Sequence, residues 1–96
     1  MGNPERIRAV AEKVMASHRA GHQVVVVVSA MSGETDRLLQ LARDMAADPA
    51  ERELDTLLST GEQVTIALLC MALEGMGQAA VSFTGTQVAI TTDSAH

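Results

Sequence analysis

Five consecutive valines, at residues 24–28, constrain the fold of this chain more than any other feature. Valine is stiff at χ1 and packs well in sheets, so the run predicts a β-strand over about residues 22–29. Because every position is apolar, this strand has no solvent-facing side, which is typical of a parallel sheet covered by helices on both faces. The segment that follows, residues 29–35, therefore lies where open α/β sheets bind ligands, just beyond the carboxyl end of a strand.

Helix signals and strand signals alternate along the rest of the chain. The predicted elements are a helix from Asn3-Pro4 to Gly21, the valine strand, a helix capped by Thr35, a short helix from Asp48-Pro49, a helix opened by Ser59-Thr60-Gly61-Glu62, a strand over 79–84 and a short strand at Val88 and Ile90. This order indicates the α/β class. It offers too few strands to bury the valine run on both edges and both faces, so we expect the chain to be part of a larger α/β protein.

Composition excludes several classes of partner. The net charge is −5, and Phe83 is the only aromatic residue, which leaves neither a basic patch nor a stacking platform for nucleic acid. The single cysteine, Cys70, lies in an apolar segment and is expected to be buried rather than reactive. The longest apolar stretches, residues 24–28 and 64–73, are shorter than the ~20 residues that span a bilayer, and no secretory signal is visible. We therefore expect a soluble cytoplasmic protein without a membrane or nucleic-acid partner.

The strand-end segment (residues 29–35) is the first candidate for chemistry. Its small residues let the backbone approach a ligand, and Gly33 permits a positive φ. Thr35 at a helix N-terminus offers a hydroxyl beside free backbone N–H groups, which suits a carboxylate or a phosphate. The alternative is an ordinary strand–helix turn in which Thr35 merely caps. The segment is neither a P-loop nor a dinucleotide fingerprint, because the required glycine and lysine pattern is absent.

The Ser59-Thr60-Gly61-Glu62 segment is the second candidate. Its pattern is that of a capping box, in which Glu62 reaches back to the amide of the N-cap residue. It also suits a carboxylate that faces a cleft and binds a cation such as a substrate ammonium group, with Gly61 allowing close approach. The two interpretations are compatible. His18 and His22 are better explained as a solvated helix end than as a metal pair, and we find no metal ligands, catalytic triad or acid–base pair.

Four segments carry a family resemblance. They are Gly2-Asn3-Pro4-Glu5-Arg6-Ile7, the valine run with Ser29-Ala30-Met31-x-Gly33-x-Thr35, Leu57-Leu58-Ser59-Thr60-Gly61-Glu62-Gln63, and Ser82-Phe83-Thr84-Gly85-Thr86-Gln87 followed by Ile90-Thr91-Thr92-Asp93. In this order and spacing the chain resembles the aspartate kinases of the amino acid kinase family. The resemblance implies a three-layer αβα sandwich around a mainly parallel sheet.

The resemblance also implies an activity and a set of binding residues. Aspartate kinases transfer the γ-phosphoryl group of Mg-ATP to the side-chain carboxylate of L-aspartate, giving 4-phospho-L-aspartate for lysine, threonine and methionine synthesis. Thr35 and Glu62 fall on the family's aspartate-binding positions, and Ser29 falls in the loop that lines the same cleft. A homo-oligomer, or an assembly with a regulatory subunit, is expected for the complete enzyme.

The chain departs from the family pattern at both ends. Met1 stands where a strand ending in Lys-Phe-Gly-Gly is expected, and the nucleotide-binding half and the regulatory ACT domains are expected beyond residue 96. We therefore expect residues 1–96 to be a partial catalytic domain that holds the aspartate side, lacks most ATP and Mg contacts, includes no catalytic residue and does not turn over alone. The alternatives are a non-catalytic α/β interaction module, such as a degenerate paralogue that docks on a complete kinase, and another amino acid kinase.

Overall fold

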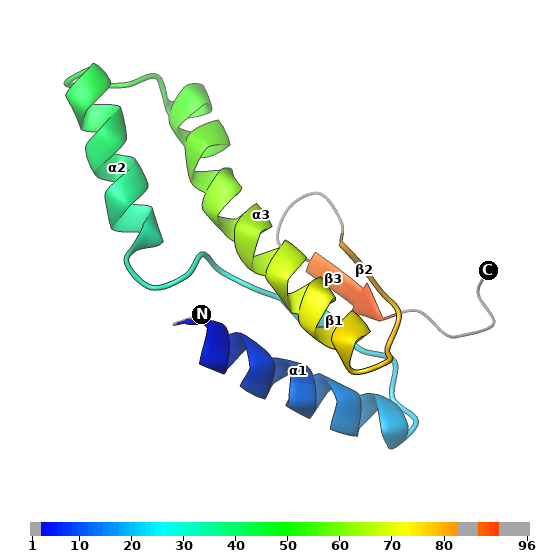
Figure 1. Ribbon diagram of the computed structural model, residues 1–96. Coiled ribbons are helices and arrows are strands. Elements are labelled where there is room, and N and C mark those ends of the chain that lie inside the picture. Colours follow the sequence, from blue (N-terminus) through cyan, green and yellow to red (C-terminus); the bar gives the residue numbers. More distant parts are fainter. Residues whose placement is uncertain (1–2, 83–86, 91–96) are drawn as a thin grey trace.

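The computed structural model describes residues 3–82 and 87–90, and most of them are helical (Figure 1). The elements in chain order are α1 (Pro4–Arg19), β1 (Val25–Val27), α2 (Glu34–Met45), α3 (Glu51–Gly75), β2 (Ala80–Ser82) and β3 (Gln87–Ile90). The strands form one sheet in the order β1-β3-β2. The α/β class is therefore confirmed at the level of its helices and strands. Of the last family motif, Phe83, Gly85, Asp93 and the other residues at 83–86 and 91–93 lie outside the described residues.

The first helix begins and ends where the sequence predicts. The Asn3 side chain accepts a hydrogen bond from the Arg6 backbone N–H at 2.9 Å, and Pro4 occupies the first helical turn. Gly21 follows the end of α1 with φ +95°, a left-handed conformation that glycine adopts without steric cost.

The core lies between α1, α3 and one face of the sheet. It consists of apolar residues from α1 and α3 together with Val28, and Val24 and Val26 pack against it; the buried members are Ile7, Ala11, Val14, Met15, Val28, Ile66, Leu69, Cys70 and Leu73. The expected burial of Cys70 is confirmed. Figure 1 shows α3 crossing the sheet with α1 beside it. This packing places the valine strand under two helices.

The prediction that the valine strand is buried on both faces is wrong for the described residues. Val25 and Val27 are 65% and 67% exposed, because alternate side chains of a strand point to opposite faces and the described helices cover only one. β1 is also an edge strand, with β3 as its only neighbour in the described sheet. The described elements are thus too few to bury the run, as its composition led us to expect.

The described sheet is not mainly parallel. β3 pairs antiparallel with both β1 and β2, so β1 and β2 run in the same direction with β3 between them. The physical reason is the length of the connections. A crossover through α2 and α3 lets β2 run parallel to β1, whereas the short link from Ser82 to Gln87 allows β3 only to turn back.

The predicted break before Ser59 is also absent, because α3 is one continuous helix of 25 residues. The Ser59 hydroxyl donates to the Thr56 carbonyl at 2.8 Å, and the Thr60 hydroxyl donates to the Leu57 carbonyl at 2.7 Å. These bonds to the preceding turn satisfy the hydroxyl groups inside a helix. The capping box that the sequence pattern indicates is therefore not formed.

By length and composition alone, α3 is able to cross a membrane, with a mean hydropathy of 1.4 in its most apolar window. It is longer than the apolar run at residues 64–73. One such helix is weak evidence, because the core helix of a globular domain passes the same test. Here α3 packs against α1, α2 and the sheet, which is the arrangement of a core helix.

Candidate functional site

The two candidate segments meet where α3 passes the start of α2. Gly61 is buried, and a Cβ placed on it would lie 3.1 Å from Ala30 Cβ, 3.3 Å from Glu34 Cγ and 3.3 Å from Leu38 Cδ1. Ordinary contacts of a Cβ are 3.4–4 Å long. The backbone of α3 therefore approaches the strand-end segment as closely as the absence of a side chain allows.

This contact brings the three predicted binding residues into one region of the fold. Each of them is the sequence neighbour of a residue in the contact: Ser29 of Ala30, Thr35 of Glu34 and Glu62 of Gly61. Ser29 and Thr35 are exposed, and Glu62 is half-buried. Segments that are about thirty residues apart in sequence thus meet at one close approach between a loop and two helices, and each candidate residue is next in sequence to a residue of that contact.

Thr35 is not the N-cap residue of α2 that the sequence predicts. The N-cap is Gly33, with φ +79°, and its carbonyl accepts the first helical hydrogen bond, from Arg37 N–H at 3.1 Å. A turn between Met31 and Glu34, closed by a 3.0 Å backbone hydrogen bond, starts the helix two residues early. Thr35 still lies in the first turn, where backbone N–H groups lack helical acceptors and no side chain caps them.

An ion pair fixes the first turn of α2. Arg37 Nε donates to Glu34 Oε2 at 3.1 Å, and Arg37 Nη2 donates to Glu34 Oε1 at 2.5 Å. The hydrogen bonds from Arg37, with its positive charge, hold the pKa of Glu34 below its ordinary value, and the same pair raises the pKa of Arg37. Glu34, which precedes Thr35 and lies next to Gly61, is therefore ionised at neutral pH, and the positive charge of Arg37 neutralises it.

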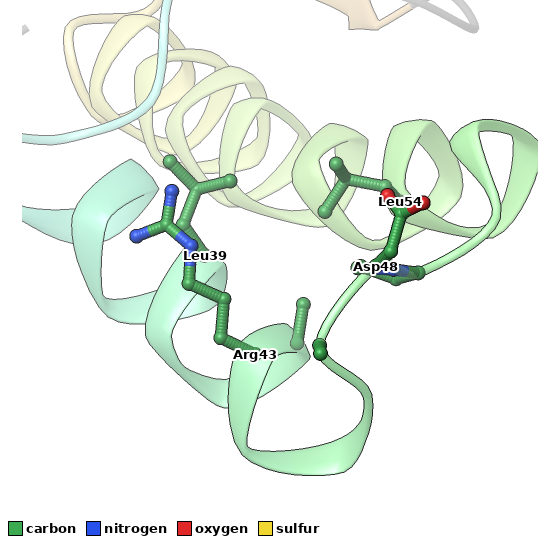
Figure 2. A pocket seen from close by; sticks show the side chains of 7 residues that line it. Leu39, Arg43, Asp48 and Leu54 are labelled. Atoms are coloured by element: carbon green, nitrogen blue, oxygen red, sulfur yellow. The ribbon is translucent and has the colours of Figure 1, made fainter.

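Two cavities lie away from the predicted site. One of about 260 Å³ opens at the far end of α2, where Leu39 and Arg43 face Asp48 and Leu54 across the gap (Figure 2). The other, of about 270 Å³, lies between α1 and α3 and is lined by Pro4, Ile7, Arg8, Leu68, Met71 and Ala72. Sequence reasoning missed both cavities. The Asp48-Pro49 signal marks the turn beside the first, but the space itself depends on how the helices pack.

Metal and thiol chemistry find little support in the part of the chain that the structure describes. No group of three or more His, Cys, Asp or Glu side chains there is placed to hold a metal ion. Cys70 is buried in the core, and burial followed by the negative charge of Glu74 raises the pKa of its thiol. The thiol is therefore protonated at neutral pH, which fits a packing role.

Comparison with known proteins places these features in a family. Residues 1–95 match the amino acid kinase family. The chain is 62% identical over 96 residues to an aspartokinase of Pseudomonas aeruginosa and 60% identical to the aspartate kinase Ask_LysC of Stutzerimonas stutzeri. It spans 23% of the length of each of these relatives.

A solved structure agrees with the sequence matches. The aspartate kinase of Synechocystis superposes with a TM-score of 0.82 and 50% identity, over 85% of this chain and 14% of that one. The family match covers all four segments that carry the resemblance. The chain belongs to the amino acid kinase family.

Proposed function

We propose that this chain is the aspartate-binding part of an aspartate kinase. The complete enzyme transfers the γ-phosphoryl group of ATP to the side-chain carboxylate of L-aspartate and gives 4-phospho-L-aspartate. The observation that carries the proposal is 60–62% identity over all 96 residues with proteins named as aspartate kinases. In this proposal residues 1–96 are a partial catalytic domain, and its three described strands belong to the sheet of a three-layer αβα sandwich.

The proposed substrate contacts follow from the chemistry of the converging segments. The Thr35 hydroxyl and the backbone N–H groups that follow Glu34 in the first turn of α2 bind a carboxylate of the substrate, because donors and the helix dipole favour a negative charge there. Glu62 pairs with the substrate ammonium group, and Ser29 lines the same cleft. The contact between Ala30 and Gly61 supports this arrangement, since it holds the two segments together.

ATP and Mg²⁺ do not fit the described residues. These residues include no carboxylate cluster suited to the metal, and Arg37, the cation next to the strand-end segment, is already paired with Glu34. Phosphoryl transfer depends on cations that stabilise the transferring group. We therefore assign the ATP and Mg²⁺ contacts to residues outside the described part, assign no catalytic residue here, and expect no turnover from residues 1–96 alone.

The family resemblance extends the proposal to the setting of the enzyme. We infer a cytoplasmic biosynthetic enzyme that assembles as a homo-oligomer or with a regulatory subunit. The net charge of −5 agrees with a protein that does not associate with nucleic acid.

Calorimetric titration of the chain with L-aspartate tests the proposed contacts. We expect measurable heat of binding, and a loss of affinity on the order of 10-fold or more in Thr35→Ala and Glu62→Gln, because each change removes a hydrogen bond to a charged group. Thr56→Ala and Glu53→Gln are the matched controls on an exposed part of α3 and should bind as the parent does. Circular dichroism verifies that each variant keeps its helices.

Two results would contradict this proposal. Equal affinity of the parent, Thr35→Ala and Glu62→Gln would remove both residues from the site. Binding of L-glutamate in preference to L-aspartate would point to another member of the amino acid kinase family.

A further inference from the structure

We propose that Gly61, together with the Glu34–Arg37 ion pair, acts as a spacer that sets the separation of Thr35 and Glu62. This inference rests on the proposed aspartate site and deepens it. It concerns residues that touch each other rather than the substrate, so Gly61, Glu34 and Arg37 are positioning residues.

Gly61 is the position at which three elements meet. The nearest atoms to its missing side chain come from the strand-end segment, through Ala30, and from α2, through Glu34 and Leu38. All three lie within 3.3 Å of the Cβ position, closer than ordinary contact. A side chain at residue 61 therefore requires these neighbours to shift by a few tenths of an ångström, or α3 to move away from the elements that carry Ser29 and Thr35.

Two of the three neighbours of Gly61, Ala30 and Glu34, have restricted freedom to give way. The Ala30 contact is made by a Cβ, which is bonded directly to the backbone and cannot rotate aside. The Glu34 contact is made by Cγ, and the carboxylate beyond it is held by two hydrogen bonds from Arg37. The ion pair thus keeps the Glu34 side chain in place against α3. Strain from a larger residue at position 61 passes to the backbone.

Glycine is an unfavourable residue inside a helix, so its presence at position 61 is informative. Glycine in the interior of a helix is less favourable than alanine, because it loses more backbone freedom on folding. Gly75 lies in the same helix with nothing within 4 Å of its Cβ position. The two glycines of α3 therefore differ in packing: Gly61 is closely packed in the interior of the helix, whereas Gly75, the last residue of the helix, has open space around its Cβ position. That difference supplies a matched control.

Steady-state kinetics of a chimera tests the spacer. Residues 1–96 replace the segment that they match in the Pseudomonas aeruginosa aspartokinase, so that the site works in a complete enzyme. Gly61→Ala should raise KM for aspartate by on the order of 10-fold or more, because small misplacements of binding groups are costly. KM for ATP should change less than about twofold, since the displacement concerns the aspartate-binding groups. Gly75→Ala should leave both constants unchanged.

Rescue by a second substitution separates positioning from general damage. Ala30→Gly removes the closest neighbour of the new methyl group, so Gly61→Ala/Ala30→Gly should recover part of the affinity for aspartate. Arg37→Met frees the Glu34 side chain and should raise KM for aspartate with a fully folded enzyme, which keeps the proposal testable if Gly61→Ala fails to fold. Equal rises in both KM values, or no rescue, would overturn the spacer.

Failure of the proposed function has a different signature. A folded parent chimera without aspartate-dependent turnover would contradict the function itself. The spacer is then decided by the unfolding free energies of Gly61→Ala, Ala30→Gly and the double variant. Coupling between the two substitutions supports the close contact, and additive effects overturn it.

Discussion

Gly61 lies so close to Ala30 that a methyl group in place of its hydrogen would stand 3.1 Å from the Ala30 Cβ. One residue belongs to a long helix and the other to the loop after the valine strand. Their contact is the structural basis for treating Ser29, Thr35 and Glu62 as parts of one site. We expect the geometry of that site to be sensitive to a single methyl group at position 61.

The core between α1 and α3 predicts unequal effects for two adjacent leucines. Leu69 is fully buried, so Leu69→Ala should lower the free energy of unfolding by about 3 kcal/mol, through lost burial and the cavity left behind. Leu68 is 37% exposed, and Leu68→Ala should cost less than about half as much. Urea denaturation followed by circular dichroism measures both. Equal losses would contradict the observed orientation of α3.

The Glu34–Arg37 pair predicts a pH-dependent contribution to stability. Because folding lowers the pKa of Glu34, the pair stabilises the folded chain above the ordinary glutamate pKa of roughly 4, and this stabilisation is lost as the pH falls through the lowered pKa. The effect should be small because both side chains are solvent-accessible. Thermal unfolding of the parent and of Glu34→Gln should therefore differ at pH 6 and converge once the pH lies well below the lowered pKa of Glu34.

The open face of β1 predicts self-association of the chain. Val25 and Val27 are mostly exposed on an edge strand, and such strands pair readily with other chains. Sedimentation velocity at increasing concentration should show oligomers, and Val25→Lys/Val27→Lys should shift the chain towards monomer. Met45→Lys, at a residue 83% exposed on α2, is the control and should not change the distribution. A parent chain that stays monomeric would count against the prediction.

Burial of Cys70 predicts slow thiol chemistry. Its raised pKa and its place in the core should make alkylation by iodoacetamide at pH 7.5 much slower in the folded chain than in urea. Mass spectrometry measures both rates. Similar rates in the two conditions would show that the core opens readily.

Local signals in the sequence predicted local structure well. The Asn3-Pro4 start of α1 follows from capping and from the fixed φ of proline, both of which act within one turn. The start of α2 was placed two residues late, because Thr35 has the side chain of an N-cap while Gly33 has the backbone freedom that the turn requires. The preference of the Thr35 side chain for the N-cap position competed with the preference of the turn for glycine at position 33. The turn determined where α2 begins.

Tertiary structure accounts for the larger differences between the predicted and the observed structure. The Ser59-x-x-Glu62 pattern is compatible with a helix start, but α3 runs through this segment without a break, with Gly61 closely packed in its interior. Exposure of Val25 likewise depends on which faces other elements cover, which no local pattern encodes. Ser29, Thr35 and Glu62 are named as site residues through the family resemblance, and their role stays a prediction. The contact between Ala30 and Gly61 could not be predicted from the sequence, because it depends on how α3 packs against the loop.

Activity of the chimera described above tests the central claim most directly. A colorimetric assay of aspartyl hydroxamate measures ATP-dependent phosphorylation of L-aspartate when residues 1–96 replace the matched segment of the Pseudomonas aeruginosa aspartokinase. The proposed function predicts kcat/KM for aspartate within about tenfold of the unmodified enzyme, and a fall on the order of 10-fold or more in Thr35→Ala and in Glu62→Gln. A folded chimera without turnover, or one that is indifferent to both substitutions, would contradict it.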